Sequence, residues 1–239
     1  MLKNVKAVLA KYWGHEDFLP LQQQAIESVL RGRDSIVVLP TGGGKSLCFQ
    51  APAVLLGGLT IVVSPLIALM KDQVDALTEC GVPAGRMDSS LSADQHKAVT
   101  AAVRNKKLRL LYVSPERLLS EGFVALLGRT EVSFVAVDEA HCVSMWGHDF
   151  RPEYRQLLPV RERYPQTVCF ALTATATPRG QNDIATNLGV RTAVSRANTQ
   201  NRGDIDLDAR GGCGGEGEAD GLRVPFAHRQ ELAVFGPGA

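Results

Sequence analysis

Short runs of apolar, mostly β-branched residues recur along the first 190 residues, and longer stretches with helical periodicity separate them. Successive apolar positions are typical of strands that are buried on both faces. These runs predict strands at residues 35–39, 60–63, 108–113, 134–137 and 168–172. The stretches between them predict helices at residues 21–31, 45–56, 66–79, 92–105, 116–127 and 178–188. The alternation predicts an α/β fold, a mostly parallel sheet covered by helices on both faces.

The pattern changes near residue 190. Residues 191–239 hold 9 of the 23 glycines, six arginines and no lysine, and no amphipathic period persists among them. We therefore predict one domain over residues 1–190. The Gly- and Arg-rich tail over residues 191–239 has no recognisable domain and is predicted to be mostly disordered.

Composition narrows the class of protein. Hydrophobic residues make up 45% of the 239 and charged residues 21%, so the chain can bury a sizeable core. The net charge of +1 does not favour nucleic-acid binding by bulk charge, although it permits a local basic groove. No apolar run is long enough to span a membrane, and no signal peptide is recognisable. Five cysteines without a CxxC pair indicate neither a zinc site nor a disulfide framework, and fit a reducing cytoplasm.

The segment Leu-Pro-Thr-Gly-Gly-Gly-Lys-Ser follows the first predicted strand and opens a helix, which is the context of a phosphate-binding loop. Glycines let backbone N–H groups turn toward phosphate oxygens, and the helix N-terminus favours an anion. Lys45 can reach the β- and γ-phosphates, and the Ser46 hydroxyl can bind Mg²⁺. The expected nucleotide-binding residues are Thr41, Gly42, Gly43, Gly44, Lys45 and Ser46. Leu39 departs from the strict pattern, which has glycine there, and an ordinary Gly-rich turn is the alternative.

Asp138 and Glu139 follow the predicted strand 134–137, where ligands of open α/β sheets bind. Asp138 is expected to hold Mg²⁺ through its water shell together with Ser46, and Glu139 to polarise an attacking water. With Lys45, these acids form the predicted catalytic set. A helix N-terminus with acidic residues in its first turn is the alternative interpretation.

Asp-Glu-Ala-His at residues 138–141 and Thr-Gly-Gly-Gly-Lys-Ser at residues 41–46 together resemble superfamily 2 helicases. Residues 62–73 resemble motif Ia of the RecQ family, residues 141–154 its aromatic-rich loop and residues 171–177 its motif III. The resemblance covers about residues 10–190. It implies the first RecA-like motor lobe of an ATP-dependent 3′–5′ DNA helicase of recombination and repair, cytoplasmic and associated with the nucleoid, that uses ATP and Mg²⁺.

The resemblance also implies residue roles in the nucleotide pocket. Gln22 matches the glutamine that reads adenine, and His15 aligns with a position where a ring stacks on the base. Leu19 stands where the family often has arginine, which puts base stacking in doubt. A solvated helix entry is the alternative for Gln22 and His15.

On the DNA side, the resemblance implies binding of single-stranded DNA, or of DNA with a single-stranded tail. The residues it assigns to DNA contact or to coupling with hydrolysis are Trp146, His148, Phe150, Arg151, Ser64, Pro65, His141, Thr173 and Thr175, with His141 as a bridge. Trp146 and Phe150 could instead fill a hydrophobic gap. Ser64–Pro65 and Ser114–Pro115 also predict helix starts, with Ser as N-cap and Pro at the first helical position. The basic patch Arg104, Lys106, Lys107 and Arg109 is expected to be a solvated surface.

Motifs IV to VI of a second RecA-like lobe are not found in this sequence, and neither is a four-cysteine zinc module. That lobe would normally complete the ATP site with an arginine finger. Two explanations stay open, a reading-frame shift in a GC-rich gene and a genuine truncated protein. Two functions stay open accordingly: the motor lobe of a helicase, or a nucleotide- and DNA-binding module without unwinding activity.

Overall fold

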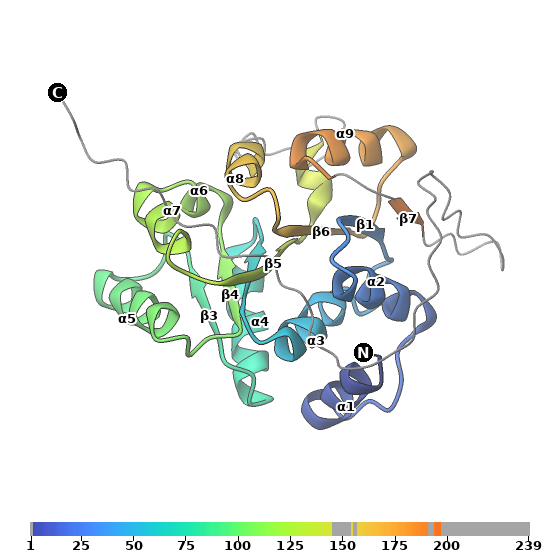
Figure 1. The fold of residues 1–239 in the computed structure, drawn as a ribbon, viewed down its shortest axis with the longest axis horizontal. Coiled ribbons are helices and arrows are strands. Elements are labelled where there is room, and N and C mark those ends of the chain that lie inside the picture. The colour runs from blue at the N-terminus through green and yellow to red at the C-terminus, as the bar shows by residue number, and fades with distance from the viewer. Residues whose placement is uncertain (1, 145–153, 155–156, 191–193, 197–239) are drawn as a thin grey trace, which may run out of the picture. The chain divides into compact units, whose positions relative to one another are not determined.

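The structure, a computed structural model, describes residues 2–144, 154, 157–190 and 194–196 (Figure 1). The predicted aromatic-rich loop residues Trp146, His148, Phe150 and Arg151 lie outside these ranges, as does nearly all of the predicted tail. No helix in the described part of the chain is long and apolar enough to cross a membrane.

A seven-stranded sheet in the order β3-β4-β2-β5-β6-β1-β7 forms the centre of the fold, and every strand pair in it is parallel. The strands are β1 (Ser35–Val38), β2 (Leu59–Val63), β3 (Ala84–Met87), β4 (Leu110–Val113), β5 (Val132–Val137), β6 (Val168–Thr173) and β7 (Val194–Arg196). The five predicted strands are all present. β3 and β7 were not predicted, and β7 extends the sheet six residues beyond the predicted domain boundary.

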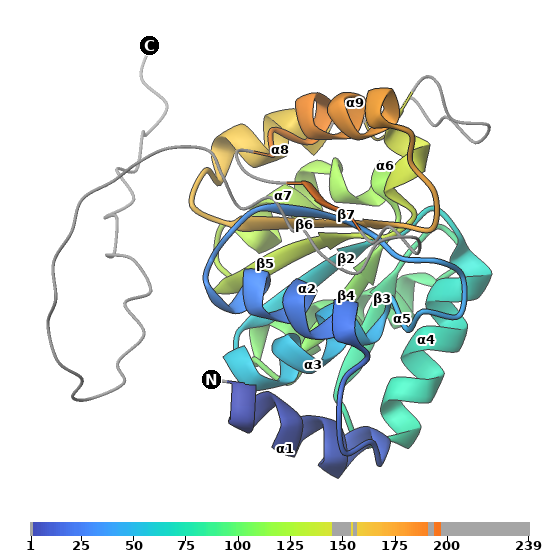
Figure 2. The same cartoon turned by 90° about the vertical axis from the view of Figure 1, so that its right-hand side faces the viewer.

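Helices cover both faces of the sheet (Figure 2). One face carries α2 (Pro20–Leu30), α3 (Leu47–Leu56) and α4 (Ile67–Glu79), with α1 (Leu2–Trp13) packed outside α2 and α3. The other carries α5 (Ala93–Arg104), α6 (Pro115–Leu118), α7 (Glu121–Leu127), the 3₁₀-helix η1 (Ala140–Val143), α8 (Leu157–Arg163) and α9 (Pro178–Leu188). The predicted fold class, a parallel α/β sheet between two helical layers, is confirmed.

Alternate residues of the strands face the two layers. In β2, Ile61 belongs to the apolar cluster beneath α5–α9, whereas Val62 belongs to the cluster beneath α2–α4. Both side chains are fully buried. This two-sided burial explains why the strand sequences are apolar at consecutive positions.

The predicted helix 178–188 agrees with α9, the predicted helices 21–31 and 92–105 differ from α2 and α5 by one residue at each end, and the other three differ in ways that have a physical reason. The predicted helix 116–127 is two helices, because Ser120 adopts an extended backbone conformation (ψ 138°) between α6 and α7. Ser114–Pro115 is the N-cap and first residue of α6, as expected. At α4 the expectation was wrong, since the N-cap is Leu66 and Ser64–Pro65 precede it. The helix predicted from Lys45 begins at Leu47.

Because all strands run the same way, their carboxyl ends meet at one edge of the sheet. β5, β6 and β1 are adjacent in the strand order. The segments that follow β5 and β1, and the end of β6, therefore lie side by side, although they are separated by many residues in sequence.

Candidate functional site: a phosphate loop facing two acids

The loop between β1 and α3 has the backbone of an anion cradle. Gly42 and Gly44 adopt left-handed conformations with φ of 80° and 66°, which glycine adopts without steric cost. A Cβ on Gly44 would lie 2.1 Å from Gln22 Nε2, so a side chain at Gly44 would displace the Gln22 amide from its present position. Within the described part of the chain, the N–H groups of Gly44, Lys45 and Ser46 donate no hydrogen bond to another protein atom. These free donors beside the start of α3 fit a bound phosphate.

Asp138 is the buried acid of the site, with 6% of its surface exposed. It directly follows β5, and its backbone N–H donates to the Val63 carbonyl at 2.8 Å. Its Oδ1 accepts the Glu139 N–H at 3.0 Å. Burial, and secondarily the negative charge of Glu139, raises the pKa of Asp138 to about 6, while Lys45 and His141 act in the opposite direction. A cation beside this carboxylate would favour its charged form.

Glu139 stands in a left-handed conformation, with φ 47° and ψ 46°. Its Oε2 lies 3.2 Å from Nδ1 of His141. This hydrogen bond holds the pKa of Glu139 below its ordinary value, with a smaller contribution from Lys45. Glu139 is therefore a carboxylate at neutral pH, as a residue that orients a water molecule must be.

His141 joins the acids to β6. The neighbouring Cys142 and then Glu139 favour the imidazolium and raise the pKa of His141 to about 10. Its Nδ1 also lies 3.1 Å from Oγ1 of Thr173. The Thr173 hydroxyl donates to the carbonyl of Thr175 at 2.9 Å, which leaves its lone pairs to accept from His141.

Thr173 also connects to the phosphate loop, since its carbonyl accepts the Leu39 N–H at 3.0 Å. The Thr173 side chain is fully buried and Thr175 is exposed. The structure thus brings together the phosphate loop, the two acids, His141 and Thr173 through short contacts on three adjacent strands.

Gln22 is buried against the phosphate loop, with 4% of its surface exposed. Its Nε2 donates to the carbonyls of Gly43 and Gly44, each at 3.3 Å, and its Oε1 accepts the Leu19 N–H at 3.0 Å. Both ends of the amide are therefore engaged within the protein. His15 is exposed, as is Leu19, so the structure places Gln22 in the site and leaves His15 at the surface.

Ser64 and Pro65, at the end of β2, are buried rather than presented on the surface. The hydroxyls of Ser64 and of Ser114, at the end of the neighbouring β4, have no hydrogen-bond partner among the described residues. Leu66, the next residue after Pro65, is 46% exposed. The predicted DNA contact at Ser64–Pro65 thus stays a prediction.

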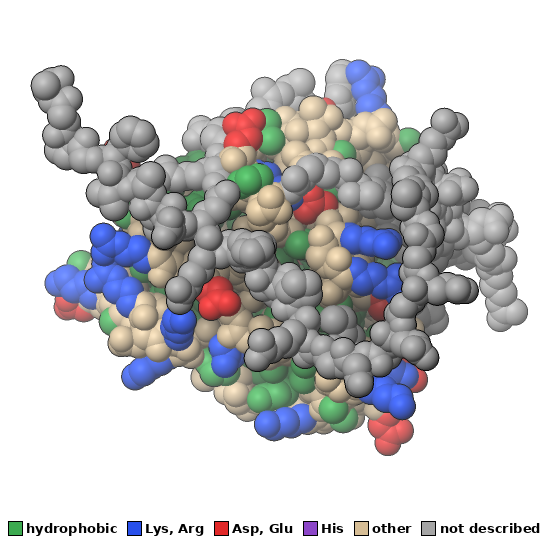
Figure 3. Space-filling view, viewed as in Figure 1, with side chains coloured by type: hydrophobic (Ala, Val, Ile, Leu, Met, Phe, Trp, Pro, Cys, Tyr) green, Lys and Arg blue, Asp and Glu red, His purple; other side chains and the backbone are tan. Residues whose placement is uncertain are grey.

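The basic patch lies at the opposite, amino edge of the sheet. Figure 3 shows Lys and Arg side chains gathered beside α5 and α7. Arg104, Lys106, Arg109 and Arg129 line a hollow of about 250 Å³ there. Its one ion pair within the described residues joins Lys106 to Glu131 at 3.9 Å, and both side chains are highly exposed. The patch is thus distant in the topology from the phosphate loop.

A buried polar link from α3, the helix that follows the phosphate loop, to α4 was not predicted from the sequence. Gln50, one turn into α3, donates to Oε1 of Gln73 on α4 at 2.7 Å and to the Tyr112 hydroxyl on β4 at 3.1 Å. Gln50 is 5% exposed. The available signal was a glutamine within an otherwise apolar helix, four residues after Ser46.

Comparisons with known proteins define the class. The sequence profile of the DEAD/DEAH box helicase family matches residues 19–184. The chain therefore belongs to the DEAD/DEAH box helicases.

Within that class, the chain is similar to RecQ proteins. It is 45% identical over 185 residues to the ATP-dependent DNA helicase RecQ of Haemophilus influenzae, covering 77% of this chain and 30% of that protein. It is 45% identical over 193 residues to RecQ of Bacillus subtilis, covering 80% and 33%. The chain thus spans about a third of these relatives. A hypothetical ATP-dependent RNA helicase from Sulfolobus tokodaii shares the fold, with a TM-score of 0.61 at 20% identity over 81% of this chain and 56% of that one.

Proposed function

We propose that this chain is the first RecA-like motor lobe of a RecQ-like, ATP-dependent 3′–5′ DNA helicase, with Mg·ATP as its nucleotide. The observation that carries the proposal is the pairing of unbonded N–H groups at Gly44, Lys45 and Ser46 with the acids that follow β5. A phosphate cradle beside two carboxylates is the arrangement that phosphoryl transfer requires. Mg²⁺ supplies charge neutralisation for the phosphates when it is bound.

The residues of the site have separate roles in binding the nucleotide and in hydrolysis. The N–H groups of the loop and the charge of Lys45 bind and orient the triphosphate. Ser46 and Asp138 would hold Mg²⁺, since hydroxyl and carboxylate oxygens are the ligands it prefers. Glu139 orients the attacking water and accepts its proton, while hydrogen-bonded His141 fixes the direction of the carboxylate.

DNA is the proposed second substrate, as a single strand or a duplex with a single-stranded tail. The name of the RecQ relatives supports DNA as the nucleic acid. The proposed contacts are Trp146, His148, Phe150 and Arg151, together with Ser64, Pro65 and Thr175. Aromatic rings stack on bases irrespective of sequence, which suits a motor that moves along DNA. The proposed place of action is the cytoplasm, at the nucleoid.

Completion of the ATP site needs a second lobe. An arginine finger from such a lobe contributes about 10³–10⁵ in rate, so we expect this chain alone to bind Mg·ATP weakly, to hydrolyse it slowly and not to unwind DNA. The alternative is a genuine single-lobe binding module. Accurate resequencing of the locus beyond codon 190 separates the two, because motifs IV to VI in another frame would identify a complete helicase.

The proposal is tested by Mg·ATP binding and by phosphate release with and without single-stranded DNA. Lys45→Ala should abolish both binding and release, and Lys107→Ala, an exposed lysine remote from the phosphate loop, should change neither. Equal nucleotide binding by wild type and Lys45→Ala would refute the assignment of the site.

A further inference from the structure

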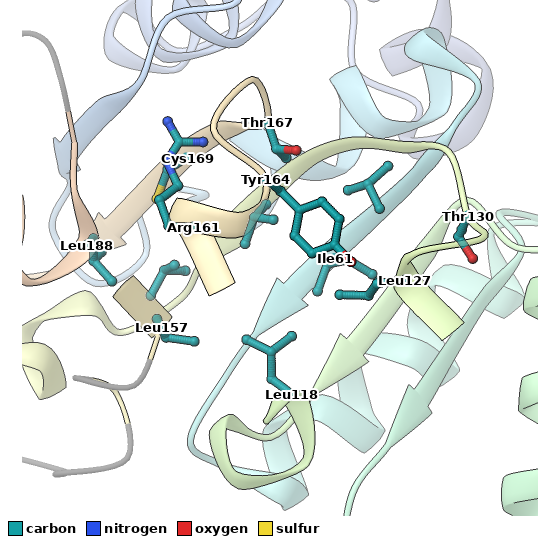
Figure 4. Close-up of a pocket in the computed structure, with 13 residues that line it drawn as sticks. Ile61, Leu118, Leu127, Thr130, Leu157, Arg161, Tyr164, Thr167, Cys169 and Leu188 are labelled. Atoms are coloured by element: carbon teal, nitrogen blue, oxygen red, sulfur yellow. The ribbon is translucent and has the colours of Figure 1, made fainter. Parts of the chain in front are cut away.

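A cavity of about 140 Å³ lies between the sheet and the helices α6, α7, α8 and α9 (Figure 4). Its walls are mainly aliphatic, and they include Ile61 on β2, Leu118 on α6, Leu127 on α7 and Leu188 on α9. None of its lining residues belongs to the phosphate loop or to the acids. An engineered apolar cavity of roughly 150 Å³ takes up benzene, so the space suits one aromatic ring.

One hydrogen-bond donor in this apolar cavity has no acceptor. The hydroxyl of Tyr164 is buried and has no hydrogen-bond partner among the described residues. The Tyr164 ring lies between Thr167 and Leu127 in the close-up, beside Ile61 (Figure 4). A buried hydroxyl without a partner lowers stability, so an acceptor brought by a ligand would be favoured there.

The other polar groups of the wall are already engaged or neutral. Arg161 pairs with Asp34 at 2.7 and 2.5 Å. The Thr130 hydroxyl donates to the Leu126 carbonyl at 2.7 Å. Cys169 is an uncharged thiol, since burial raises its pKa to about 12. An occupant would therefore meet no unpaired charge, and the Tyr164 hydroxyl is the lining polar atom that is both buried and without a partner among the described residues.

The two ends of the cavity differ in exposure. Ile61 and Leu118 are buried, whereas Thr130, Tyr164 and Thr167 are half-buried. The Tyr164 hydroxyl itself is buried, so the exposed part of this residue is not its hydroxyl. A ligand that entered past the half-buried residues would meet the Tyr164 hydroxyl inside the cavity.

We propose that this cavity is a binding site for an uncharged, monocyclic aromatic molecule with one hydrogen-bond acceptor, oriented by the Tyr164 hydroxyl. The proposal is independent of the nucleotide site and of helicase activity.

Two probes of nearly equal size test it on the full 239-residue chain. Acetophenone carries a carbonyl acceptor, and ethylbenzene does not. Titrations followed by calorimetry and by methyl NMR shifts should show both binding, acetophenone more tightly by about three- to tenfold, the worth of one hydrogen bond. Tyr164→Phe should equalise the two affinities and leave ethylbenzene binding unchanged.

Leu118→Phe supplies a second variant, because the larger ring occupies the cavity and should abolish binding of both probes. If Leu118→Phe fails to fold, the affinities of the two probes for the wild type and for Tyr164→Phe still test the proposal. Three results would overturn the proposal: no binding of either probe tighter than about 1 mM, equal affinities in the wild type, or displacement of the probes by Mg·ATP.

Discussion

Glu139 carries the clearest backbone strain of the site. A glutamate at φ 47° is rare, and such conformations cost on the order of 1–3 kcal/mol. The surrounding contacts keep it there, since its N–H donates to Asp138 and its carboxylate meets His141. A strained backbone that Asp138 and His141 hold in place is consistent with a role of Glu139 in which the position of its carboxylate matters.

Glu139→Gln should therefore separate binding from hydrolysis. We expect nucleotide affinity to change little and single-turnover hydrolysis to fall about 10²–10⁴-fold, because the general base is lost. The pKa of His141 should also fall from about 10, since one of the two groups that favour the imidazolium is removed. Phosphate release and an NMR titration of His141 measure the two effects.

Glu131→Gln is the matched control, because Glu131 is highly exposed and its ion pair with Lys106 spans 3.9 Å. It should alter neither hydrolysis nor the His141 titration. An unchanged His141 titration in Glu139→Gln would contradict the hydrogen bond seen here.

Asp138 gives the site a dependence on pH. Its pKa of about 6 lies above the ordinary 3.8, so the folded chain binds this proton more tightly than the unfolded chain does. This group therefore adds stability below pH 4, and the contribution is lost as the pH rises through 6. Mg²⁺ needs the carboxylate, so Mg²⁺ affinity in the absence of nucleotide should fall about tenfold per unit below pH 6.

Calorimetric titration of Mg²⁺ between pH 5 and pH 8 measures this dependence. Asp138→Asn has no proton to lose at this position, so its weaker Mg²⁺ binding should vary little over the same range. A wild-type affinity that is flat from pH 5 to pH 8 would rule the assignment out.

At the scale of elements, α2 holds the phosphate loop through one side chain. Gln22 on α2 donates to the Gly43 and Gly44 carbonyls, and Gly44 has no room for a Cβ against it. The conformation of the phosphate loop and the position of α2 are thus linked by packing as well as by hydrogen bonds.

Gly44→Ala tests this link, with Gly57→Ala as its control. Both glycines have positive φ, 66° and 82°, but a Cβ on Gly57 meets nothing within 4 Å. Gly57→Ala should lower the free energy of unfolding by about 1–2 kcal/mol, the backbone cost alone. Gly44→Ala should cost more and should also weaken nucleotide binding, because Gln22 must move. Urea denaturation compares the two, and equal losses would contradict the packing argument.

The strands that could be predicted from the sequence are those that are buried on both faces. The five predicted strands are apolar on both faces, so their composition alone marks them. β3 reads Ala-Gly-Arg-Met, and its buried positions are Gly85 and Met87. Because glycine stands at one of the two buried positions and is a poor strand former, neither periodicity nor propensity indicated this strand. β7 has three residues and exists through its pairing with β1, a contact that no local pattern reveals.

Some features of the site could likewise be predicted from the sequence, and others could not. The residues of the phosphate loop and the acids were predictable because a short motif follows a strand. The left-handed Glu139 and the influence of Cys142 on His141 were not, because they depend on the local backbone conformation after β5. The engagement of Gln22 was not, because it depends on a tertiary contact with the phosphate loop.

At the scale of the whole described sheet, β7 covers the open side of β1. Residues Ile36–Val38 pair with Val194–Arg196. Without β7, β1 would become an edge strand with unpaired backbone groups, which favours aggregation. The strand that leads into the phosphate loop is thus protected by residues beyond the predicted boundary at 190.

Truncated chains test whether β7 stabilises the sheet. A chain ending at residue 190 should melt several degrees below the full chain and should aggregate more readily, whereas one ending at residue 205 should behave as the full chain does. Thermal melts and light scattering compare the three. Equal behaviour of the 190-residue and full-length chains would show that β7 is dispensable.

The adjacency of β5, β6 and β1 has a consequence for how such a site can change. β6 separates the strand that ends in the acids from the strand that leads into the phosphate loop, so two strand spacings, about 10 Å, lie between those two strands. That span is a property of peptide hydrogen bonding and is the same whatever side chains the loops carry. Substitutions in the loops can therefore change the charge, proton affinity and nucleotide preference of the site, while the spacing between β1 and β5 stays constant.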